Sequence, residues 1–368
     1  MKNLVILLII LAMFVTFFAC VKTPTDSLPI NTNKADSGDI LVLSEGLQGY
    51  DNSALTLIKS QSGEVVKEYF KSSNNNEKLG DTANDIILKG DTAIIVLTTP
   101  SILRLVNIKS GLKIKDIPMP ENCQPRHIDR ISDSTFCVSC LLRNSIVIVN
   151  INSSSIQKEI EVGPQPEGIA YHDGFIFTAN SAYGDFNYLH PDAGTISIIS
   201  LENSLEIKKI KSGTNCNEVL VVPEHDLLFA AYYDLPSRED STGGIVMYKL
   251  KTLEEVRRWS IRTRNLTFNP FDNKLYFISQ KPKGSKTMGE SGISVLDFET
   301  GKITSLVVNN YPQDIWYGLS VSHLDGSIWL CNAGNHINNG KILKFNTLGV
   351  QEHSFEVMQN PNTIIFVR

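Results

Sequence analysis

Residues 163–181 read GPQPEGIAYHDGFIFTANS. An apolar run at residues 169–171 is followed by the pair Asp173-Gly174 and by a second apolar run at residues 175–177. Asp-Gly between two apolar runs is a strong short-range signal for a β-hairpin. The fold class depends on whether this hairpin is isolated or recurs along the chain.

The hairpin recurs. Each copy has a polar connector, an apolar strand, a short turn and a second apolar strand. The copies are NDIILKGDTAIIVLTT (84–99), RHIDRISDSTFCVSC (126–140), EGIAYHDGFIFTANS (167–181), NEVLVVPEHDLLFAAYY (217–233), NLTFNPFDNKLYFIS (265–279) and GLSVSHLDGSIWLCNA (318–333). Their first apolar anchors are Ile86, Ile128, Ile169, Val219, Leu266 and Leu319, which are 42, 41, 50, 47 and 53 residues apart. A second hairpin follows each copy, as in SILRLVNIKSGLKIKDIPM (101–119). Four strands in each repeat of this length are typical of β-propeller blades.

The two ends of the chain complete the repeat. The chain ends with PNTIIFVR (361–368), a first strand without its partners, and begins with DILVLSEG (39–46), ALTLIKS (54–60) and EVVKEYF (64–70). We therefore predict an all-β fold, a seven-bladed β-propeller of four-stranded antiparallel blades in which the N- and C-terminal strands share one blade. Tandem β-sandwiches would lack the fixed four-strand period, and a β-helix would have a shorter repeat.

Residues 1–20 differ from the rest of the chain. Lys2 is the only charge before an apolar run at residues 4–18, which is followed by Ala19 and Cys20. A membrane anchor helix would need a longer run, whereas a secretory signal has this length and these flanks. The segment resembles a bacterial lipoprotein signal peptide in which Cys20 is lipidated. Residues 21–38 are rich in Pro, Ser, Thr, Asn and Asp, so we expect a flexible tether between the lipid and the propeller domain at residues 39–368.

Charge and motifs exclude several function classes. The formal net charge of −5, with no long basic run, argues against nucleic acid as a partner. Cys137 and Cys140 form a C-x-x-C, but residues three apart on a strand face opposite sides and no second ligand pair is present, so we predict no metal site. The cysteines after Cys20 are odd in number and cannot all pair. No G-x-S-x-G or H-E-x-x-H motif is present, so we predict neither a catalytic constellation nor a cofactor.

Antiparallel strands sort the loops onto two faces. The hairpin turns are short and share one face, whereas the long loops share the other, where binding sites usually lie. The connectors before the first strands place Asp85, Arg126, Glu167, Asn217, Arg264, Tyr317 and Asn362 at equivalent positions around the channel mouth. Its acids, Asp85 and Glu167, are too few for a hard cation. The predicted ligand contacts are Arg126, Glu167, Tyr183, Tyr188, Tyr232, Tyr233, Arg264, Trp316, Tyr317 and Asn335. Aromatic residues would stack and arginines would bind carbonyl or phosphate oxygens; the alternative is that the aromatic residues only cap the core between blades.

Three stretches carry a family resemblance. LVLSEGLQGYDNSALTLI (41–58), LGDTANDIIL (79–88) and VGPQPEGIAYHDGFIFTANS (162–181) resemble YVTN-type seven-bladed propellers. More closely, they are similar to lipoprotein propellers that partner TonB-dependent transporters in outer membranes, among them surface cobalamin-capture lipoproteins. The resemblance implies an outer-membrane lipoprotein of the cell envelope that binds a corrinoid or another nutrient. The residues after Cys20 lack an acidic cluster, so both a surface-exposed and a periplasm-facing position stay open.

The leading hypothesis is a non-enzymatic, lipid-anchored propeller that binds a ligand on its long-loop face and passes it to a transporter. One alternative is a propeller enzyme, either a lactonase or a quinoprotein-like oxidoreductase. The other is a scaffold that binds only proteins. Fold similarity alone does not choose among them.

Overall fold

The computed structural model describes residues 35–36, 38–235, 237–238, 241–280, 292–311 and 313–367. The predicted signal peptide, with Cys20, and most of the predicted tether lie outside the described residues. Residues 33–368 form one compact unit. In the part of the chain that is described, no helix has the length and apolar character needed to cross a membrane.

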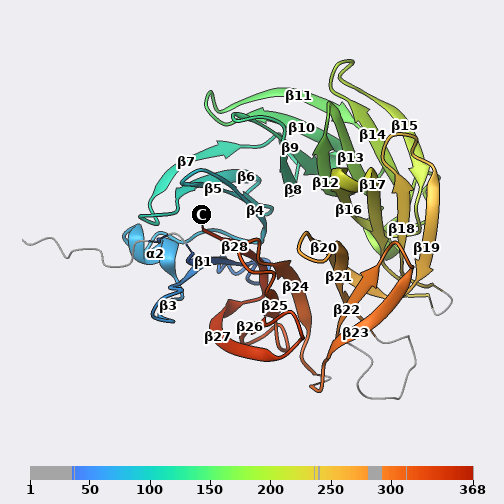
Figure 1. Cartoon of the computed structure of the whole chain (residues 1–368). Coiled ribbons are helices and arrows are strands. Elements are labelled where there is room, and N and C mark those ends of the chain that lie inside the picture. Colours follow the sequence, from blue (N-terminus) through green and yellow to red (C-terminus); the bar gives the residue numbers. More distant parts are fainter. Residues whose placement is uncertain are drawn as a thin grey trace, which may run out of the picture. The chain divides into compact units, whose positions relative to one another are not determined.

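The unit is a seven-bladed β-propeller, as predicted, with each blade a sheet of four antiparallel strands (Figure 1). The first blade consists of β28 (Pro361–Phe366), β1 (Ile40–Ser44), β2 (Ala54–Ile58) and β3 (Val65–Val66). The next blades are β4 (Ala83–Lys89), β5 (Thr92–Leu97), β6 (Ile102–Asn107) and β7 (Lys113–Pro118); β8 (Pro125–Arg130), β9 (Thr135–Cys140), β10 (Ser145–Asn150) and β11 (Ser155–Glu161); and β12 (Pro166–His172), β13 (Phe175–Asn180), β14 (Thr195–Ser200) and β15 (Leu205–Lys211). The last three are β16 (Cys216–Val222), β17 (Leu227–Tyr232), β18 (Gly244–Lys249) and β19 (Glu255–Ser260); β20 (Thr263–Asn269), β21 (Lys274–Ser279), β22 (Gly292–Asp297) and β23 (Lys302–Val308); and β24 (Trp316–Val321), β25 (Ile328–Asn332), β26 (Asn339–Phe345) and β27 (Gln351–Gln359).

The two ends of the propeller unit close the ring. Strand β28 pairs antiparallel with β1, with Ile40 opposite Phe366 and Val42 opposite Ile364. Each first strand also contacts the first strand of the next blade, from β4 and β8 round to β24, β28 and β4 again. The predicted closure in one blade is therefore confirmed. Closure gives every blade of the described unit its first strand, so exposed sheet edges are confined to the outer strands.

The core lies between neighbouring blades. Leu41 and Leu43 of β1, for example, pack in one cluster with Ile95 and Leu97 of β5. Second strands such as β9 and β13 are buried along nearly their whole length, since both faces of a blade are covered. Fourth strands such as β11 lie at the rim and are mostly exposed. This explains why the second strands read as continuous apolar runs.

The fourth strand predicted at residues 64–70 differs in part from the structure. Only Val65 and Val66 form β3, after which the chain turns into the short helix α2 (Tyr69–Ser73). Tyr69 and Phe70 are fully or almost fully buried there, and the Tyr69 hydroxyl donates a 2.9 Å hydrogen bond to the carbonyl of Ile108. Burying two aromatic side chains against the next blade outweighs continued pairing at an exposed sheet edge.

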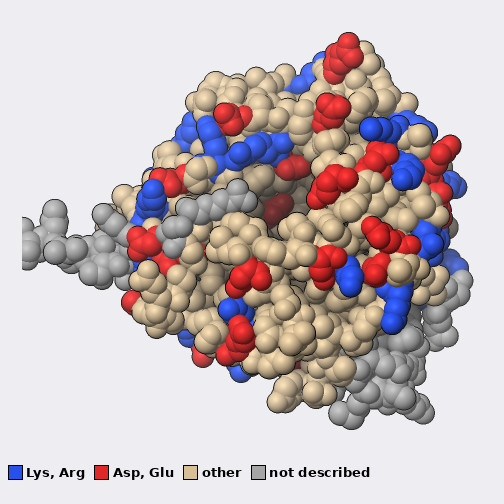
Figure 2. Space-filling view, in the orientation of Figure 1, with Lys and Arg blue, Asp and Glu red and all other residues tan. Residues whose placement is uncertain are grey.

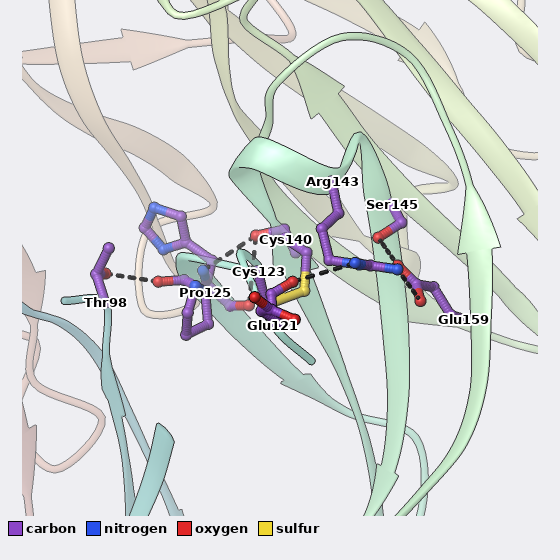
Figure 3. The surroundings of a disulfide bond; sticks show 10 residues. Thr98, Glu121, Cys123, Pro125, Cys140, Arg143, Ser145 and Glu159 are labelled. Atoms are coloured by element: carbon purple, nitrogen blue, oxygen red, sulfur yellow. Dashed lines mark hydrogen bonds and ion pairs between the residues drawn. A yellow bond between two sulfur atoms is a disulfide. The ribbon is translucent and has the colours of Figure 1, made fainter. Parts of the chain in front are cut away.

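One pair of cysteines in the described chain is joined in a disulfide. Cys123, in the connector before β8, is bonded to Cys140 at the end of β9, with 4.6 Å between their Cα atoms (Figure 3). Cys137, the other member of the C-x-x-C, is a buried free thiol, and burial raises its pKa well above the usual value. The disulfide links the connector that precedes Arg126 covalently to the end of β9.

Three short 3₁₀ helices complete the description. They are η1 (Leu141–Arg143), η2 (Gly184–Phe186) and η3 (Pro223–His225). Beside the disulfide, Arg143 at the end of η1 makes a two-point ion pair with Glu159, at 2.6 and 2.9 Å (Figure 3). Ser145 donates to the same carboxylate at 2.7 Å, so this corner of the blade is fixed by polar contacts as well as by the disulfide.

Candidate functional site

Each first strand has a register shift near its start, and one residue at or next to that shift lines the central cavity. The shift leaves at least one residue between the paired ends of the ladder, as at Asn84 between Ala83 and Asp85. Counted back two from each apolar anchor, the equivalent residues are Asn84, Arg126, Glu167, Asn217, Arg264, Tyr317 and Asn362, which we call the ring residues. The prediction of Asp85 at this position was wrong by one residue. A bulge re-aims a side chain away from the ladder, and that shift is not visible in the apolar pattern.

Most of the connectors share a left-handed residue just before the ring residue. In five of them, the residue two positions before the ring residue has a left-handed backbone, with φ between 44° and 61°. These residues are Thr82, Gln124, Gln165, Asn215 and Asn360. A left-handed residue bends the chain sharply. These five connectors therefore enter the channel mouth with a similar bend.

The ring residues line a cavity of about 650 Å³ at the mouth of the central channel. Figure 2 shows that the propeller unit is hollowed at its centre and that acidic side chains are visible within the hollow. Loops add further side chains to the lining, namely Glu45, Tyr183, Asp185, Asn215 and Tyr233. A cavity of this volume is large enough for a small organic molecule.

The structure brings together six of the predicted contact residues. Arg126, Glu167, Tyr183, Tyr233, Arg264 and Tyr317 all line the cavity. The remaining four predicted contacts lie elsewhere. Tyr232 and Trp316 are 7% and 8% exposed and pack in the core between blades. The Tyr188 ring lies under the guanidinium of Arg238, 5.4 Å away. Asn335 is an exposed turn residue whose side chain accepts the backbone N–H groups of residues 337 and 338.

Arg126 and Glu167 form a bridge between neighbouring blades. Nε of Arg126 donates a 2.9 Å hydrogen bond to Oε2 of Glu167, whose side chain is 6% exposed. Burial lowers the pKa of Arg126, but the charge of Glu167 outweighs this effect and the pKa is raised. The two terminal nitrogens of Arg126 make no hydrogen bond with the described residues. They remain available as donors in the cavity.

Tyr233, Glu218 and Arg264 form a second group. The Tyr233 hydroxyl donates to Oε1 of Glu218, and the two Glu218 oxygens accept the backbone N–H groups of Asn265 and Leu266 at 2.8 and 2.7 Å. The Arg264 guanidinium lies 5.3 Å from the centre of the Tyr233 ring. Among the described residues, no carboxylate forms an ion pair with Arg264. Its guanidinium packs instead on the aromatic face of Tyr233.

Tyr317 is held by Glu45 and is influenced by both arginines. Its hydroxyl donates a 2.6 Å hydrogen bond to Oε2 of Glu45, and its ring makes an edge contact with His336. Burial and then the charge of Glu45 raise the pKa of Tyr317, while Arg126 and Arg264 both act in the opposite direction. The net effect keeps the hydroxyl protonated at neutral pH, so it stays a hydrogen-bond donor.

His127 and Asp85, which lie far apart in the sequence, form a polar pair. Nδ1 of His127 lies 3.2 Å from Oδ2 of Asp85, although the residues are 42 positions apart and lie in neighbouring blades. The same Asp85 oxygen accepts the backbone N–H of Ile128 at 3.1 Å. Burial lowers the pKa of His127, but the hydrogen bond and charge of Asp85 outweigh it and raise the pKa.

Tyr183 is presented by an unusual backbone. Ala182, Tyr183 and Gly184 are consecutive left-handed residues, with φ of 54°, 52° and 57°. Glycine adopts this conformation without strain, whereas alanine and tyrosine do not. Strained residues of this kind concentrate at functional sites. The side chain of Tyr183 is 54% exposed at the edge of the cavity.

The cavity holds more acids than the sequence suggested. Beside Asp85 and Glu167 it is lined by Glu45, Asp185 and Glu218. Glu45 comes from the loop after β1, Asp185 lies two residues after Tyr183, and Glu218 follows Asn217. Within the described part of the chain, no group of three or more Asp, Glu, His or Cys residues could hold a metal ion. The carboxylates are instead bonded to neighbouring donors.

The chain matches no protein-family model and no curated protein. Among solved structures it is similar to a quinonprotein alcohol dehydrogenase-like protein from Bacteroides thetaiotaomicron VPI-5482, with a TM-score of 0.64 and 12% identity over 90% of this chain and 78% of that one. It is also similar to a proposed 6-phosphogluconolactonase from Bacteroides fragilis NCTC 9343, with a TM-score of 0.64 and 11% identity over 92% of this chain and 100% of that one. A virginiamycin B lyase from Staphylococcus aureus has a TM-score of 0.55 and 13% identity over 75% of this chain and 84% of that one.

These similarities show the propeller fold alone. The neighbours include enzymes of different kinds, and one fold carries many activities. The chemistry of this chain must therefore be argued from its own cavity.

Proposed function

We propose that this chain is a lipid-anchored propeller of the cell envelope that captures a polar organic molecule in the cavity at the channel mouth. The observation that carries the proposal is the convergence of all the ring residues on that one cavity. Side chains that seven blades direct to one point serve a ligand better than they serve packing.

The cavity offers donors and acceptors in separate places. The open nitrogens of Arg126 and the guanidinium of Arg264 are donors, whereas Glu45, Asp185 and the ring amides supply acceptors. Tyr183 adds an aromatic surface at the edge. A ligand with many amide or hydroxyl groups would satisfy both kinds of partner. A corrinoid has an amide-rich periphery of this kind, and the family resemblance favours it.

A corrinoid would not have to fit wholly inside the cavity. The loops that carry Glu45 and Tyr183 also expose large apolar side chains, with Leu189 80%, Phe186 79% and Tyr50 69% exposed. Ile337, next to His336, is 73% exposed. Such side chains favour contact with the outer part of a ligand or with a protein. A TonB-dependent transporter that receives the ligand is the partner we propose for them.

The envelope location rests on two features. The first is the lipoprotein-like segment ending at Cys20. The second is the disulfide between Cys123 and Cys140, since disulfides persist in exported proteins and are rare in a reducing cytosol. Metabolic labelling with a radioactive fatty acid tests the anchor directly. The chain should be labelled, and the variant Cys20→Ala should not.

The capture proposal is tested by calorimetric titration of residues 33–368 with cobalamin. We expect one-to-one binding with a sub-micromolar Kd. The variant Arg264→Gln should bind at least about tenfold more weakly, because a charge-assisted hydrogen bond contributes roughly 1.5–3 kcal/mol. The matched control is Arg257→Gln on the rim strand β19, which should bind as the unchanged protein does. No heat with cobalamin would reject a corrinoid, and equal weakening in both variants would reject the cavity as the binding site.

A further inference from the structure

His127 lies just after a ring residue. In two other blades that position holds an acid, Asp85 or Glu218, which accepts the backbone N–H of the next blade's anchor. This is a structural brace between blades. In its own blade His127 occupies the same position but turns back to Asp85 instead. Asp85 thus already has its structural partner in Ile128, and the brace does not require the imidazole.

The contact fixes which nitrogen of His127 carries the proton. An ionised carboxylate only accepts hydrogen bonds, so Nδ1 must be the donor to Asp85. Nε2 is then the basic nitrogen. It has no hydrogen-bond partner among the described residues, and His127 lines the cavity with a side chain that is 36% exposed. Asp85 is itself held by the backbone N–H groups of Ile86 and Ile128.

The surroundings make Nε2 of His127 a stronger base than that of an ordinary histidine. The charged groups that act on His127 are Asp85, Glu167 and Arg126, of which the two carboxylates raise its pKa and the guanidinium lowers it. The cavity as a whole is lined by more acids than arginines. A site of this sign repels anions, so a neutral ester would enter it more readily than an anionic one. Arg126, next to His127 in sequence, directs open N–H donors into the same space.

The geometry points to a second activity for the cavity, the hydrolysis of a neutral carboxylic ester with His127 as the general base, Asp85 as its positioning residue and Arg126 as the oxyanion donor. The inference rests on the proposed function only in taking the cavity as the ligand site. It requires no nucleophilic side chain, since water attacks directly.

The reaction balances with water as the only co-reactant. Nε2 takes a proton from water while the water oxygen forms a bond to the carbonyl carbon. The carbonyl electron pair moves to its oxygen, which the N–H groups of Arg126 stabilise. The carbonyl then re-forms, the bond to the alcohol oxygen breaks, and that oxygen takes the proton from Nε2. One ester and one water give one acid and one alcohol.

The test measures hydrolysis of p-nitrophenyl acetate by the full chain in detergent. We expect turnover above the buffer rate, and a loss of roughly 100-fold in His127→Gln, which is a typical contribution of a general base. The matched control is His172→Gln, a change in a short hairpin turn on β12, which should keep the full rate. Equal rates in the two variants, or no turnover above buffer in the unchanged chain, would overturn the inference.

Two further measurements, a pH profile of the rate and a melting temperature, separate catalysis from folding. The rate should fall as the pH drops through a value above the ordinary histidine pKa of about 6.5, and Asp85→Asn should move that inflection to lower pH. A merely structural role for Asp85 would leave the inflection where it is. His127→Gln should also keep the melting temperature of the unchanged chain. Loss of hydrolysis with a retained melting temperature supports the inference, whereas retained hydrolysis overturns it whether or not cobalamin binds.

Discussion

Arg126 and Glu167 occupy the same position in neighbouring blades, and Nε of the first lies 2.9 Å from Oε2 of the second. This contact holds Arg126, which lines the cavity, against the neighbouring blade. Glu167 is nearly buried and Arg126 is partly exposed, with side-chain exposures of 6% and 22%. The pair therefore contributes to the cavity and to the stability of the fold together.

Replacing one member of this pair should cost more than replacing both. Arg126→Ala leaves a buried carboxylate without its ion-pair partner, and we expect the free energy of unfolding to fall by about 3 kcal/mol. Arg126→Ala combined with Glu167→Ala should recover part of that loss. Urea denaturation of the four proteins of this double-mutant cycle measures the coupling. Strictly additive losses would show that the contact carries no energy.

Removing the disulfide should destabilise the propeller locally. Cys123 and Cys140 are 17 residues apart, and cross-linking a loop of that length stabilises a protein by about 3 kcal/mol. Cys123→Ser with Cys140→Ser should lower the melting temperature by several degrees. Because the connector leads directly to Arg126, ligand affinity should fall as well. The control is Cys331→Ser, a change at a buried free cysteine. This variant should melt at a lower temperature, and dithiothreitol should still lower that temperature further because the disulfide is intact. A melting temperature that dithiothreitol leaves unchanged in the unaltered protein would contradict this prediction.

Removing the last strand should open the ring. Strand β28 supplies the inner edge of the first blade and pairs with β1 along its length. Deleting residues 361–368 exposes the apolar face of β1 and removes the contacts of β28 with β24 and β4. We expect loss of the near-ultraviolet circular dichroism signal and aggregation. Deleting residues 1–32 is the matched truncation and should leave a folded, soluble unit. A soluble, cooperatively unfolding product of the first deletion would disprove closure by this strand.

One ion pair should make stability depend on acid pH. Arg104 is almost buried and binds Asp116 through two hydrogen bonds, of 2.8 and 2.7 Å. Burial raises the pKa of Asp116, but Arg104 outweighs this effect and holds it below its usual value. The carboxylate therefore stabilises the fold above its unfolded pKa, and that stability is lost as the pH falls through the lower folded pKa.

The corresponding variant is Asp116→Asn. At pH 7 it should lower the free energy of unfolding by about 1 kcal/mol, a value reduced because Asp116 is partly exposed. The difference from the unchanged protein should shrink as the pH falls below about 4. Asp91→Asn, at an exposed ion pair with Lys109, is the control and should have little effect at any pH. A difference that stays constant down to pH 2 would rule out this titration.

The sequence predicted the fold because a propeller is built from local repeats. Each hairpin signals itself through apolar runs and turn residues that are close in sequence, and the fixed period gives the number of blades. It failed at residues 67–70, where the predicted outer strand ends early and the chain enters α2, because the burial of Tyr69 and Phe70 depends on the next blade. It also failed by one residue at Asp85, because a bulge changes which side chain faces the channel.

The site was predicted less fully. The ring residues Arg126, Glu167, Arg264 and Tyr317 were found from their equivalent places in the repeat, and they line the cavity. Tyr232 and Trp316 were predicted from their aromatic character, yet they fill the core between blades. An aromatic side chain at a strand end suits either role, and only the position of the neighbouring blade decides between them.

The sequence by itself thus determined the architecture, its seven-fold count and the closure of the ring, because these follow from patterns within each repeat. Only the tertiary structure decided which side chains meet. The pairing of His127 with Asp85, of Tyr317 with Glu45 and of Cys123 with Cys140 joins segments whose separation in sequence gives no sign of contact. The chemistry of the cavity depends on those meetings, since the charge and the available protons of each group are set by the partner that the fold places beside it.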